Sequence, residues 1–255
     1  MGTALITGAS AGLGLEFAWQ LATARHDVVL VARDTERLER LASQLRAAAG
    51  VHAEVLTADL TDRADVERVA ERLRATERRV GLLVNNAGLG IGQRFVGGDL
   101  AREEAALDLM VRAVLVLSHA AAGAMTERGR GAILNVASVA ALTAGGTYAA
   151  AKAWVRTFTE GLAVELEGTG VTATALCPGL THTEFHDRAG LRAAESYPEI
   201  AWLSADRVVA TALADVRRGA VISTPSLRYQ VASGLLRAMP RSVVRRLGDV
   251  RPDRD

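Results

Sequence analysis

Lysine is almost absent from this sequence. Lys152 is the only lysine among 30 basic residues, and the other 29 are arginines. An arginine guanidinium spreads its charge over a planar fork, whereas a lysine ammonium is a compact point charge on a flexible stem. One interpretation of Lys152 is that a single surface lysine has survived by chance. Its neighbours, described below, favour a position where the ammonium itself is needed.

Other absences bound the class of protein. The single cysteine, Cys177, excludes an internal disulfide framework and fits a reducing compartment. A formal net charge of +1 removes the main electrostatic argument for a nucleic-acid partner. No apolar run approaches the roughly 20 residues needed to span a bilayer, and the first run is too short for a signal peptide. These features predict a cytoplasmic protein.

What the sequence does contain is an alternation of strand-like and helix-like segments. Hydrophobic residues make up 49% of the chain, enough for a sizeable core. Nearly continuous apolar strands are expected at residues 4–7, 27–32, 51–57, 82–84, 132–136 and 171–176. Helices are expected after Asp34, from Asp62, over about 102–125 and over about 148–166. This alternation indicates an α/β fold with a parallel sheet covered on both faces. We expect one domain over residues 1–225, with 226–255 as a basic extension of it.

A glycine-rich turn, Thr7-Gly8-Ala9-Ser10-Ala11-Gly12-Leu13-Gly14, follows the first apolar strand. Glycines let a backbone turn sharply and approach a ligand closely. The helix that begins here points unpaired N–H groups and the positive end of its dipole at the turn, which suits a phosphate. The spacing differs from the G-x-G-x-x-G of the broader dinucleotide fingerprint. By itself the turn is also compatible with a plain connection between a strand and a helix.

Polar or small residues also stand at the carboxyl ends of the other expected strands. In open parallel sheets a ligand binds outside these ends. The residues expected at this edge are Arg33, Asp59, Asn85, Asn86, Ala87, Gly88, Ser138, Pro178 and Gly179. Asn85 and Asn86 have an alternative role, because side-chain amides also satisfy backbone groups where a strand ends.

Tyr148 and Lys152 are four residues apart at the start of an expected helix, so they share one face of it. A nearby cation favours the phenolate and lowers a tyrosine pKa, which brings the group into range for proton transfer near neutral pH. Ser138 ends the preceding strand, where its hydroxyl can lie beside the same substrate oxygen. An ordinary exposed Tyr-Lys pair is the alternative, but this pair holds the only lysine of the chain.

With these residues in place, the sequence resembles the short-chain dehydrogenase/reductase family over about residues 3–223. The resemblance rests on Thr7-Gly8-x-x-x-Gly12-x-Gly14, Asp59, Asn85-Asn86-Ala87-Gly88, Ser138, Tyr148-x-x-x-Lys152 and Pro178-Gly179, in this order. It implies a doubly wound Rossmann-type domain whose seven parallel strands have the order 3-2-1-4-5-6-7. It also implies an enzyme that interconverts a secondary alcohol and a ketone or aldehyde by hydride transfer with a nicotinamide cofactor.

The resemblance gives each motif a role. Ser138 orients the substrate oxygen, Tyr148 donates or takes its proton, and Lys152 binds the nicotinamide ribose and lowers the pKa of Tyr148. The cofactor-binding residues it implies are Gly8, Ser10, Gly12, Leu13, Gly14, Arg33, Asp59, Leu60, Asn86, Ala87, Gly88, Tyr148, Lys152, Pro178, Gly179, Thr181 and Thr183. Of these, Thr183 matches the threonine that often bonds the carboxamide of the nicotinamide. No metal is expected. Family habit predicts a homodimer or homotetramer, often packed through the long helices.

The end of the second strand favours NADP(H) over NAD(H). Relatives that prefer NAD usually carry an acid at this place, where this chain has Ala32 followed by Arg33. An arginine can hold a ribose 2′-phosphate by charge-assisted hydrogen bonds. Against this, Ser10-Ala11 supplies no second basic residue in the glycine turn, and Arg33 is also compatible with a solvated loop cation.

Met110 is the main departure from the family pattern. Many relatives have a catalytic Asn at the aligned place, which helps to hold a water in a proton relay to the lysine. A methionine cannot form those side-chain hydrogen bonds. The alternative function is therefore a cofactor-binding sensor or scaffold with little turnover. The intact Ser138, Tyr148 and Lys152 favour the enzyme.

The last 75 residues are less informative. Residues 180–203 are expected to cover the substrate, with Phe185, Leu191, Tyr197 and Trp202 as apolar members. From Ser226 to Gly248 there is no acid but five arginines, with Leu227, Val231, Leu235 and Met239 at steps of four. A stripe of this kind is typical of core packing with a solvated basic face, which we favour. The alternative is a helix that binds a membrane surface or a partner.

Overall fold

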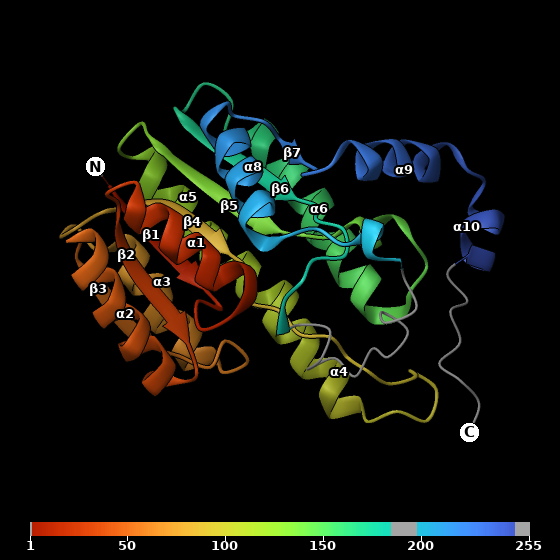
Figure 1. Ribbon diagram of the computed structural model, residues 1–255, viewed down its shortest axis with the longest axis horizontal. Helices are drawn as coiled ribbons and strands as arrows, with labels where there is room; N and C mark the ends of the chain where they lie inside the picture. Colours follow the sequence, from red (N-terminus) through yellow and green to blue (C-terminus); the bar gives the residue numbers. More distant parts are fainter. Residues whose placement is uncertain (1, 185–197, 248–255) are drawn as a thin grey trace.

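The computed structural model describes residues 2–184 and 198–247. Its centre is a seven-stranded parallel sheet with the strand order β3-β2-β1-β4-β5-β6-β7 (Figure 1), as predicted. The strands are β1 (Thr3–Thr7), β2 (Asp27–Ala32), β3 (Ala53–Thr57), β4 (Val80–Asn85), β5 (Gly131–Val136), β6 (Val171–Leu176) and β7 (Ile222–Ser223). The short β7 was not located from the sequence, because two residues carry no periodic signal.

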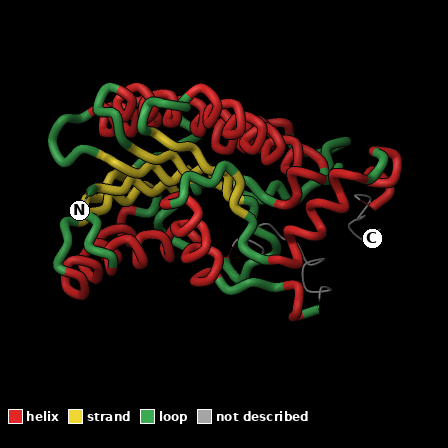
Figure 2. Tube along the Cα trace, turned by 90° about the horizontal axis from the view of Figure 1, so that it is seen from above, coloured by secondary structure: helices red, strands yellow, loops and turns green. Residues whose placement is uncertain are grey.

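Helices cover both faces of the sheet (Figure 2). One face packs against α1 (Gly12–Thr23), α2 (Thr35–Ala49) and α8 (Ala205–Arg217). The other packs against α3 (Arg63–Arg74), α5 (Ala113–Thr126) and α6 (Gly146–Glu165). The strands are apolar along nearly their whole length because both of their faces are buried. The sheet is therefore a rigid base whose carboxyl-end edge presents the loops.

Aspartate side chains fix the starts of two helices where the sequence predicted them. The Asp34 carboxylate accepts the Arg37 N–H at 3.0 Å at the start of α2, and Asp62 accepts the Asp65 N–H at 3.0 Å at the start of α3. Such caps satisfy backbone donors that a helix start leaves unpaired.

The helix expected over about 102–125 is interrupted. It consists of α4 (Leu100–Leu107), a π-helical turn η1 (Asp108–Arg112) and α5. Taken as one stretch, Leu100–Thr126 is long enough to cross a membrane, and an 18-residue window within it has a mean hydropathy of 1.6, which was not anticipated from the sequence. The buried side chains of α5, among them Leu117 and Met125, pack on the sheet and α3 as those of a core helix.

The C-terminal segment corrects a second expectation. It forms α9 (Leu227–Ala238) and α10 (Arg241–Leu247), which lie at the opposite side of the molecule from β3 (Figure 1). The stripe expected to pack in the core faces solvent, since Leu227, Val231 and Leu235 are 73%, 56% and 57% exposed. The opposite face of α9, with Tyr229 and the buried Ser233, contacts the body of the protein.

Candidate active site

The glycine turn between β1 and α1 has a backbone that only glycines accommodate. Gly8 and Gly12 adopt left-handed conformations, with φ of +67° and +55°. A Cβ at Gly14 would lie 2.1 Å from the Gly8 carbonyl oxygen, so this glycine lets α1 pack directly on the turn. Ser10 lies in the turn, while the Leu13 side chain packs on the core. The turn therefore brings the start of α1 to the carboxyl end of β1.

The N-terminus of α1 fits a phosphate. Its N-cap residue is Ala11, which offers no side-chain cap, and its first turn contains no acid. By contrast, α2, α3 and α4 each begin with an aspartate that accepts a backbone N–H. The first N–H groups of α1 thus remain available to an anion, as a nucleotide-binding turn requires. The residues present fit the pyrophosphate of a dinucleotide.

Asn86 braces this turn from β4. Its side-chain amide donates to the Thr7 carbonyl oxygen at 2.9 Å, and the Thr7 hydroxyl accepts the N–H groups of Asn86 at 2.9 Å and Ala87 at 3.0 Å. These contacts are the backbone-satisfying role considered for Asn86. They also place Ala87 and Gly88 beside the turn.

Asn85 points into the protein instead. Its amide donates to the Ser118 hydroxyl at 3.1 Å and to the Asn135 side chain at 2.9 Å, and Asn135 in turn donates to Thr159 at 3.0 Å. All four residues are buried. A fully bonded polar network of this kind joins β4 and β5 to α5 and α6, and so fixes the sheet edge relative to the two helices.

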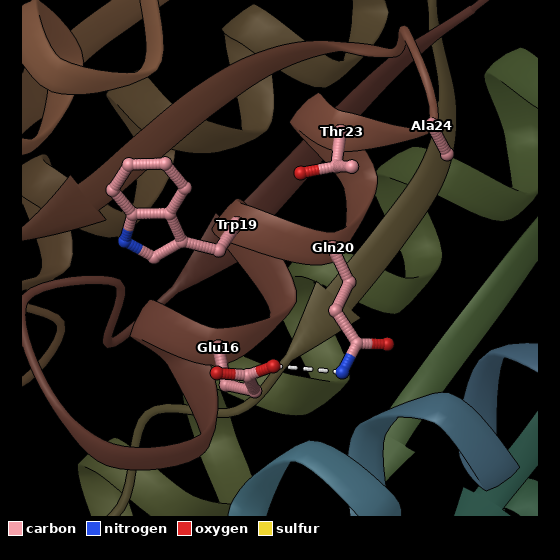
Figure 3. Close-up of a pocket in the computed structure, with 5 residues that line it drawn as sticks. All are labelled: Glu16, Trp19, Gln20, Thr23 and Ala24. Carbon is pink, nitrogen blue, oxygen red and sulfur yellow. Dashed lines mark hydrogen bonds between the residues drawn. The ribbon is translucent and has the colours of Figure 1, made fainter. Parts of the chain in front are cut away.

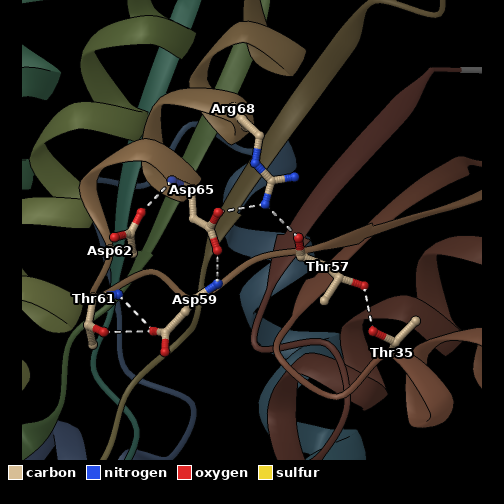
Figure 4. Close-up of polar contacts among 7 residues, drawn as sticks. All are labelled: Thr35, Thr57, Asp59, Thr61, Asp62, Asp65 and Arg68. Atoms are coloured by element: carbon tan, nitrogen blue, oxygen red, sulfur yellow. Dashed lines mark hydrogen bonds and ion pairs between the residues drawn. The ribbon is translucent and has the colours of Figure 1, made fainter.

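Arg33 and Asp59 meet at the far side of the edge, at the ends of β2 and β3. Arg33 Nη1 lies 3.9 Å from Asp59 Oδ2, and the Arg33 side chain is 76% exposed. The Asp59 carboxylate accepts both the N–H and the hydroxyl of Thr61, at 3.0 and 2.8 Å, and its own N–H donates to Asp65 (Figure 4). A long, exposed ion pair is weak, so Arg33 is free to change partner for a phosphate.

Asp65 is the hub of this corner of the sheet. Its carboxylate accepts the Arg68 guanidinium at 2.6 Å and the Asp59 N–H at 2.7 Å (Figure 4). The Arg68 hydrogen bond and then the Asp59 N–H hold the pKa of Asp65 below its usual value. Leu60, which follows Asp59 in the chain, is buried in the core. The loop at Asp59 is therefore fixed both by the hydrogen bond to Asp65 and by the packing of Leu60.

Ser138, Tyr148 and Lys152 come together at the ends of β5 and α6, as predicted. Ser138 caps a short 3-10 helix, η2 (Val139–Leu142), by accepting the Ala140 N–H at 3.1 Å, and its side chain is hydrogen-bonded to Tyr148. The Lys152 ammonium lies 5.8 Å from the centre of the Tyr148 ring. A serine hydroxyl, a phenol and an ammonium therefore share one place at the sheet edge.

Lys152 is buried, with 4% of its surface exposed, and its ammonium donates to the Val136 carbonyl oxygen at 2.8 Å. Burial lowers the pKa of Lys152 to about 8. An ammonium carries three donors. Within the described residues one of these donors binds the Val136 carbonyl oxygen, and the other two can bind ribose hydroxyls.

The expected lowering of the Tyr148 pKa was wrong for the protein alone. Although part of the side chain is accessible, burial raises the pKa of Tyr148 to about 12, and the hydrogen bond with Ser138 opposes that rise. The Lys152 ammonium lies over the face of the ring and donates to the Val136 carbonyl oxygen. The hydrogen bond with Ser138 is one contact that favours the phenolate.

Met110 lies close to Lys152. It belongs to the π-helical turn η1 and is 1% exposed. A Cβ at Gly88 would lie 3.5 Å from the Lys152 ammonium and 3.8 Å from Met110 Sδ, so the sulfur and the ammonium flank the same glycine. Single π-helical turns are frequent at functional sites. The thioether of Met110 cannot form the side-chain hydrogen bonds that an asparagine would offer near Lys152.

The described start of the loop after β6 lies beside the Ser138 segment and the glycine turn. Pro178 accepts the Val139 N–H at 3.0 Å, which joins it to the segment after Ser138. Thr181 donates to the Gly179 carbonyl at 3.0 Å, and a Cβ at Gly12 would lie 3.2 Å from Thr183 Cβ. Thr183 thus lies over the glycine turn. Of the apolar residues expected to cover a substrate, Trp202 stacks on His182 with ring centres 4.7 Å apart; Phe185, Leu191 and Tyr197 lie outside the described residues.

Sequence reasoning missed Tyr229. The Tyr229 hydroxyl accepts the Leu180 N–H at 3.1 Å and donates to the Ala201 carbonyl at 2.8 Å. A Cβ at Gly179 would lie 2.0 to 2.5 Å from three carbons of its ring. The only signal in the sequence was a tyrosine on a helix whose apolar stripe lies on the other face.

One surface hollow lies away from this edge of the sheet. This open hollow on the outer side of α1 is lined by Glu16, Trp19, Gln20, Thr23 and Ala24 (Figure 3), and no predicted site residue lines it. Among residues 2–184 and 198–247, no three His, Cys, Asp or Glu side chains gather to hold a metal ion.

Comparison with known proteins decides the family. The family model for short chain dehydrogenases matches residues 2–193. The chain belongs to the short-chain dehydrogenase family. A sulfoacetaldehyde reductase from Chromohalobacter salexigens is 39% identical over 186 residues, which cover 71% of this chain and 73% of that protein.

Solved structures of the short-chain dehydrogenase family agree over the whole chain. A short-chain dehydrogenase from Sphingobium yanoikuyae, solved in complex with NADPH, is 35% identical, with a TM-score of 0.84 and coverage of 100% of this chain and 98% of that one. An alcohol dehydrogenase from Comamonas testosteroni, specific for bulky-bulky ketones, is 32% identical, with a TM-score of 0.80 and coverage of 95% and 96%. The protein is an NAD(P)-dependent dehydrogenase or reductase of this family.

Proposed function

We propose that this enzyme uses NADP(H) to interconvert a secondary alcohol and a ketone or aldehyde, with Tyr148 as the general acid and base. The observation that carries the proposal is the meeting of Ser138, Tyr148 and Lys152 at the sheet edge, next to a glycine turn that fits a pyrophosphate. The cofactor supplies the hydride. Glycine-turn N–H groups would hold its pyrophosphate and Lys152 its nicotinamide ribose.

In the reductive direction, the substrate carbonyl oxygen lies between the hydroxyls of Ser138 and Tyr148. As a hydride adds to the carbonyl carbon, the oxygen becomes basic and takes the Tyr148 proton, which gives the alcohol and leaves a phenolate. The Ser138 hydrogen bond and the Lys152 ammonium stabilise that negative charge. Oxidation runs the same transfers backwards, with the phenolate as base.

Arg33 supports the preference for NADP(H). It is an exposed cation at the end of β2 that forms a 3.9 Å ion pair with Asp59. A ribose 2′-phosphate would accept charge-assisted hydrogen bonds from this guanidinium. The NADPH in the related Sphingobium yanoikuyae structure also favours this cofactor.

Met110 favours the second candidate, a cofactor-binding sensor or scaffold with little turnover. Its buried sulfur beside Gly88 removes a side-chain anchor for a relay water near Lys152. If the protein is an enzyme, a water bound to a backbone carbonyl of this helix still connects Lys152 to solvent, and Met110→Asn leaves kcat equal or higher. In the sensor reading, the natural protein shows no turnover with any carbonyl, while Met110→Asn does.

We also propose a cytoplasmic homodimer or homotetramer. The buried, unpaired Cys177 suits a reducing compartment. The outer faces of α5 and α6 carry the exposed Leu115 and Val164 beside a groove lined by His119, Phe158 and Leu162, an apolar surface that a second copy would cover. Light scattering tests the assembly: Leu115→Glu shifts the mass to a monomer if this face is the interface.

The experiment that tests the function is a panel of ketones, aldehydes and secondary alcohols assayed with NADPH, NADH and their oxidised forms. The absorbance of the reduced nicotinamide follows turnover. We expect carbonyl reduction with NADPH at a higher kcat/KM than with NADH. Turnover confined to NADH, or with neither cofactor across the panel, contradicts the proposal.

A further inference from the structure

The start of helix α9 holds both ends of the segment that follows β6. Tyr229 bonds to Leu180 on one side and to Ala201 on the other, at 3.1 and 2.8 Å. The neighbouring Arg228 donates to the Ile200 carbonyl. Two consecutive side chains of one helical turn therefore bind three backbone groups of this loop region.

The two ends held by Tyr229 also bind one another. The Leu203 N–H donates to the Leu180 carbonyl at 2.9 Å, and the His182 N–H donates to the Leu203 carbonyl at 3.0 Å. Thr181 forms a parallel bridge with Leu203. The Tyr229 hydroxyl thus bridges the same two stretches that these backbone bonds join.

Gly179 is shaped to receive this tyrosine. Its φ lies outside the left-handed region, so the backbone itself does not require a glycine there. The space above its Cα is filled by the Tyr229 ring, which would meet a Cβ at 2.0 Å. The glycine therefore serves the ring, and any larger residue would push the ring and its hydroxyl away.

We propose that Tyr229 is a positioning residue for the nicotinamide end of the cofactor site. The argument rests on the proposed function. Tyr229 fixes Gly179 and Leu180, the residues directly before Thr181, and Thr183 packs over Gly12 in the glycine turn. Tyr229 reaches the cofactor through these residues without touching it. Helix α9 in this way helps to position the loop that follows β6.

Binding of NADPH and of a fragment separates positioning from general stability. We use adenosine 2′,5′-bisphosphate, which reaches the Arg33 end but has no nicotinamide. Tyr229→Phe keeps the ring and loses two hydrogen bonds, so we expect its Kd for NADPH to rise about three- to tenfold. Its Kd for the fragment stays within twofold, and KM for NADPH rises more than kcat falls. Gln230→Ala, which loses a hydrogen bond from the next residue of α9 to Thr224, is the control and changes neither Kd.

A steric test keeps the proposal falsifiable if binding changes are small. Gly179→Ala weakens NADPH binding more than Tyr229→Phe does, because the new methyl displaces the ring. In the double variant Gly179→Ala/Tyr229→Ala the methyl has room, so the loss is no greater than in Tyr229→Ala alone. Equal weakening of NADPH and fragment by Tyr229→Phe, or additive losses in the double variant, overturns the proposal. Because binding is measured without turnover, an inactive natural protein would refute the proposed reaction and leave this test intact.

Discussion

Helices α6 and α9 each carry a stripe of side chains spaced four residues apart, but the stripe is buried on α6 and exposed on α9. Lys152 on α6 is 4% exposed, whereas Leu227 on α9 is 73% exposed. Helix α6 lies against β6 and η2 at the sheet edge, while α9 contacts the protein through one narrow face. Spacing tells which side chains share a helix face, but only the neighbours decide whether that face is covered.

The buried ammonium on α6 and the exposed apolar stripe on α9 also differ in their cost to the stability of the fold. Burying an ammonium is costly unless acceptors replace water. The Val136 carbonyl supplies one acceptor, and the lowered pKa of Lys152 records the part of the cost that remains. An exposed apolar stripe carries no comparable penalty. The buried end of α6 is thus specialised for chemistry, and the outer face of α9 contributes little to the fold.

Among the variants that test the contrast between buried and exposed side chains, the largest effect is expected at the buried cation. Lys152→Arg keeps the charge, but a planar guanidinium cannot occupy the space of a compact ammonium beside Val136 and Gly88. We expect kcat to fall at least about a hundredfold. The control is the reverse exchange on the same helix, Arg156→Lys, which keeps its ion pair with Glu160 and its activity. If Lys152→Arg kept its activity, the ammonium of Lys152 would not be required for the reaction.

The next effect concerns an exposed cation with a specific ligand. Arg33→Ala should weaken NADPH binding about ten- to a hundredfold, since charge-assisted hydrogen bonds to the 2′-phosphate are lost. NADH affinity should barely change. Arg40→Ala, which removes another exposed guanidinium paired with Glu36, controls for net charge. Calorimetric titration of both cofactors decides, and equal losses for NADPH and NADH would assign Arg33 to general packing.

The buried ammonium also gives stability a pH dependence. Between pH 8 and 10.5 the unfolded chain keeps the Lys152 proton and the folded protein has lost it, so the free energy of unfolding rises with pH. The slope from this group is at most about 1.4 kcal/mol per pH unit. Two buried acids oppose this rise at higher pH. Burial raises the pKa of Cys177 from 9.0 to about 11 and that of Tyr148 from 10.0 to about 12, so their contributions to stability fall with pH above about 9 and 10, respectively. Urea unfolding of the cofactor-free protein from pH 7.5 to 8.5, below the range in which Cys177 opposes the effect, should show the rise, and Lys152→Met should remove it. A natural protein with a flat profile would show that the ammonium is not buried.

The smallest effect is expected on the exposed stripe. Val155→Ala on α6 removes a fully buried side chain and should cost about 2 kcal/mol of stability. The matched change Val231→Ala on α9 should stay within about 0.5 kcal/mol. Denaturant unfolding of the two variants measures both. A comparable loss at Val231 would mean that the outer face of α9 is covered in solution.

The sequence predicted the parts of the fold that have long periodic patterns. The parallel sheet and the aspartate caps of α2 and α3 follow from apolar runs and capping residues. The strand order and the meeting of Ser138, Tyr148 and Lys152 were implied by the resemblance to the family. The π-helical turn at Met110 was missed because it changes the helix geometry without changing its composition. The exposure of α9 and the contact of Tyr229 with Gly179 depend on residues distant in the chain, which no local pattern reveals.

The central claim is that the Tyr148 hydroxyl carries the proton of the reaction. Tyr148→Phe removes that oxygen and keeps the ring beside Lys152. In one preparation, NADPH affinity is measured by calorimetry and carbonyl reduction by the absorbance of NADPH. The account predicts an NADPH Kd within several-fold of the natural value and a kcat lowered by about a hundred- to ten-thousandfold. An unchanged kcat in a variant that binds NADPH normally would contradict it.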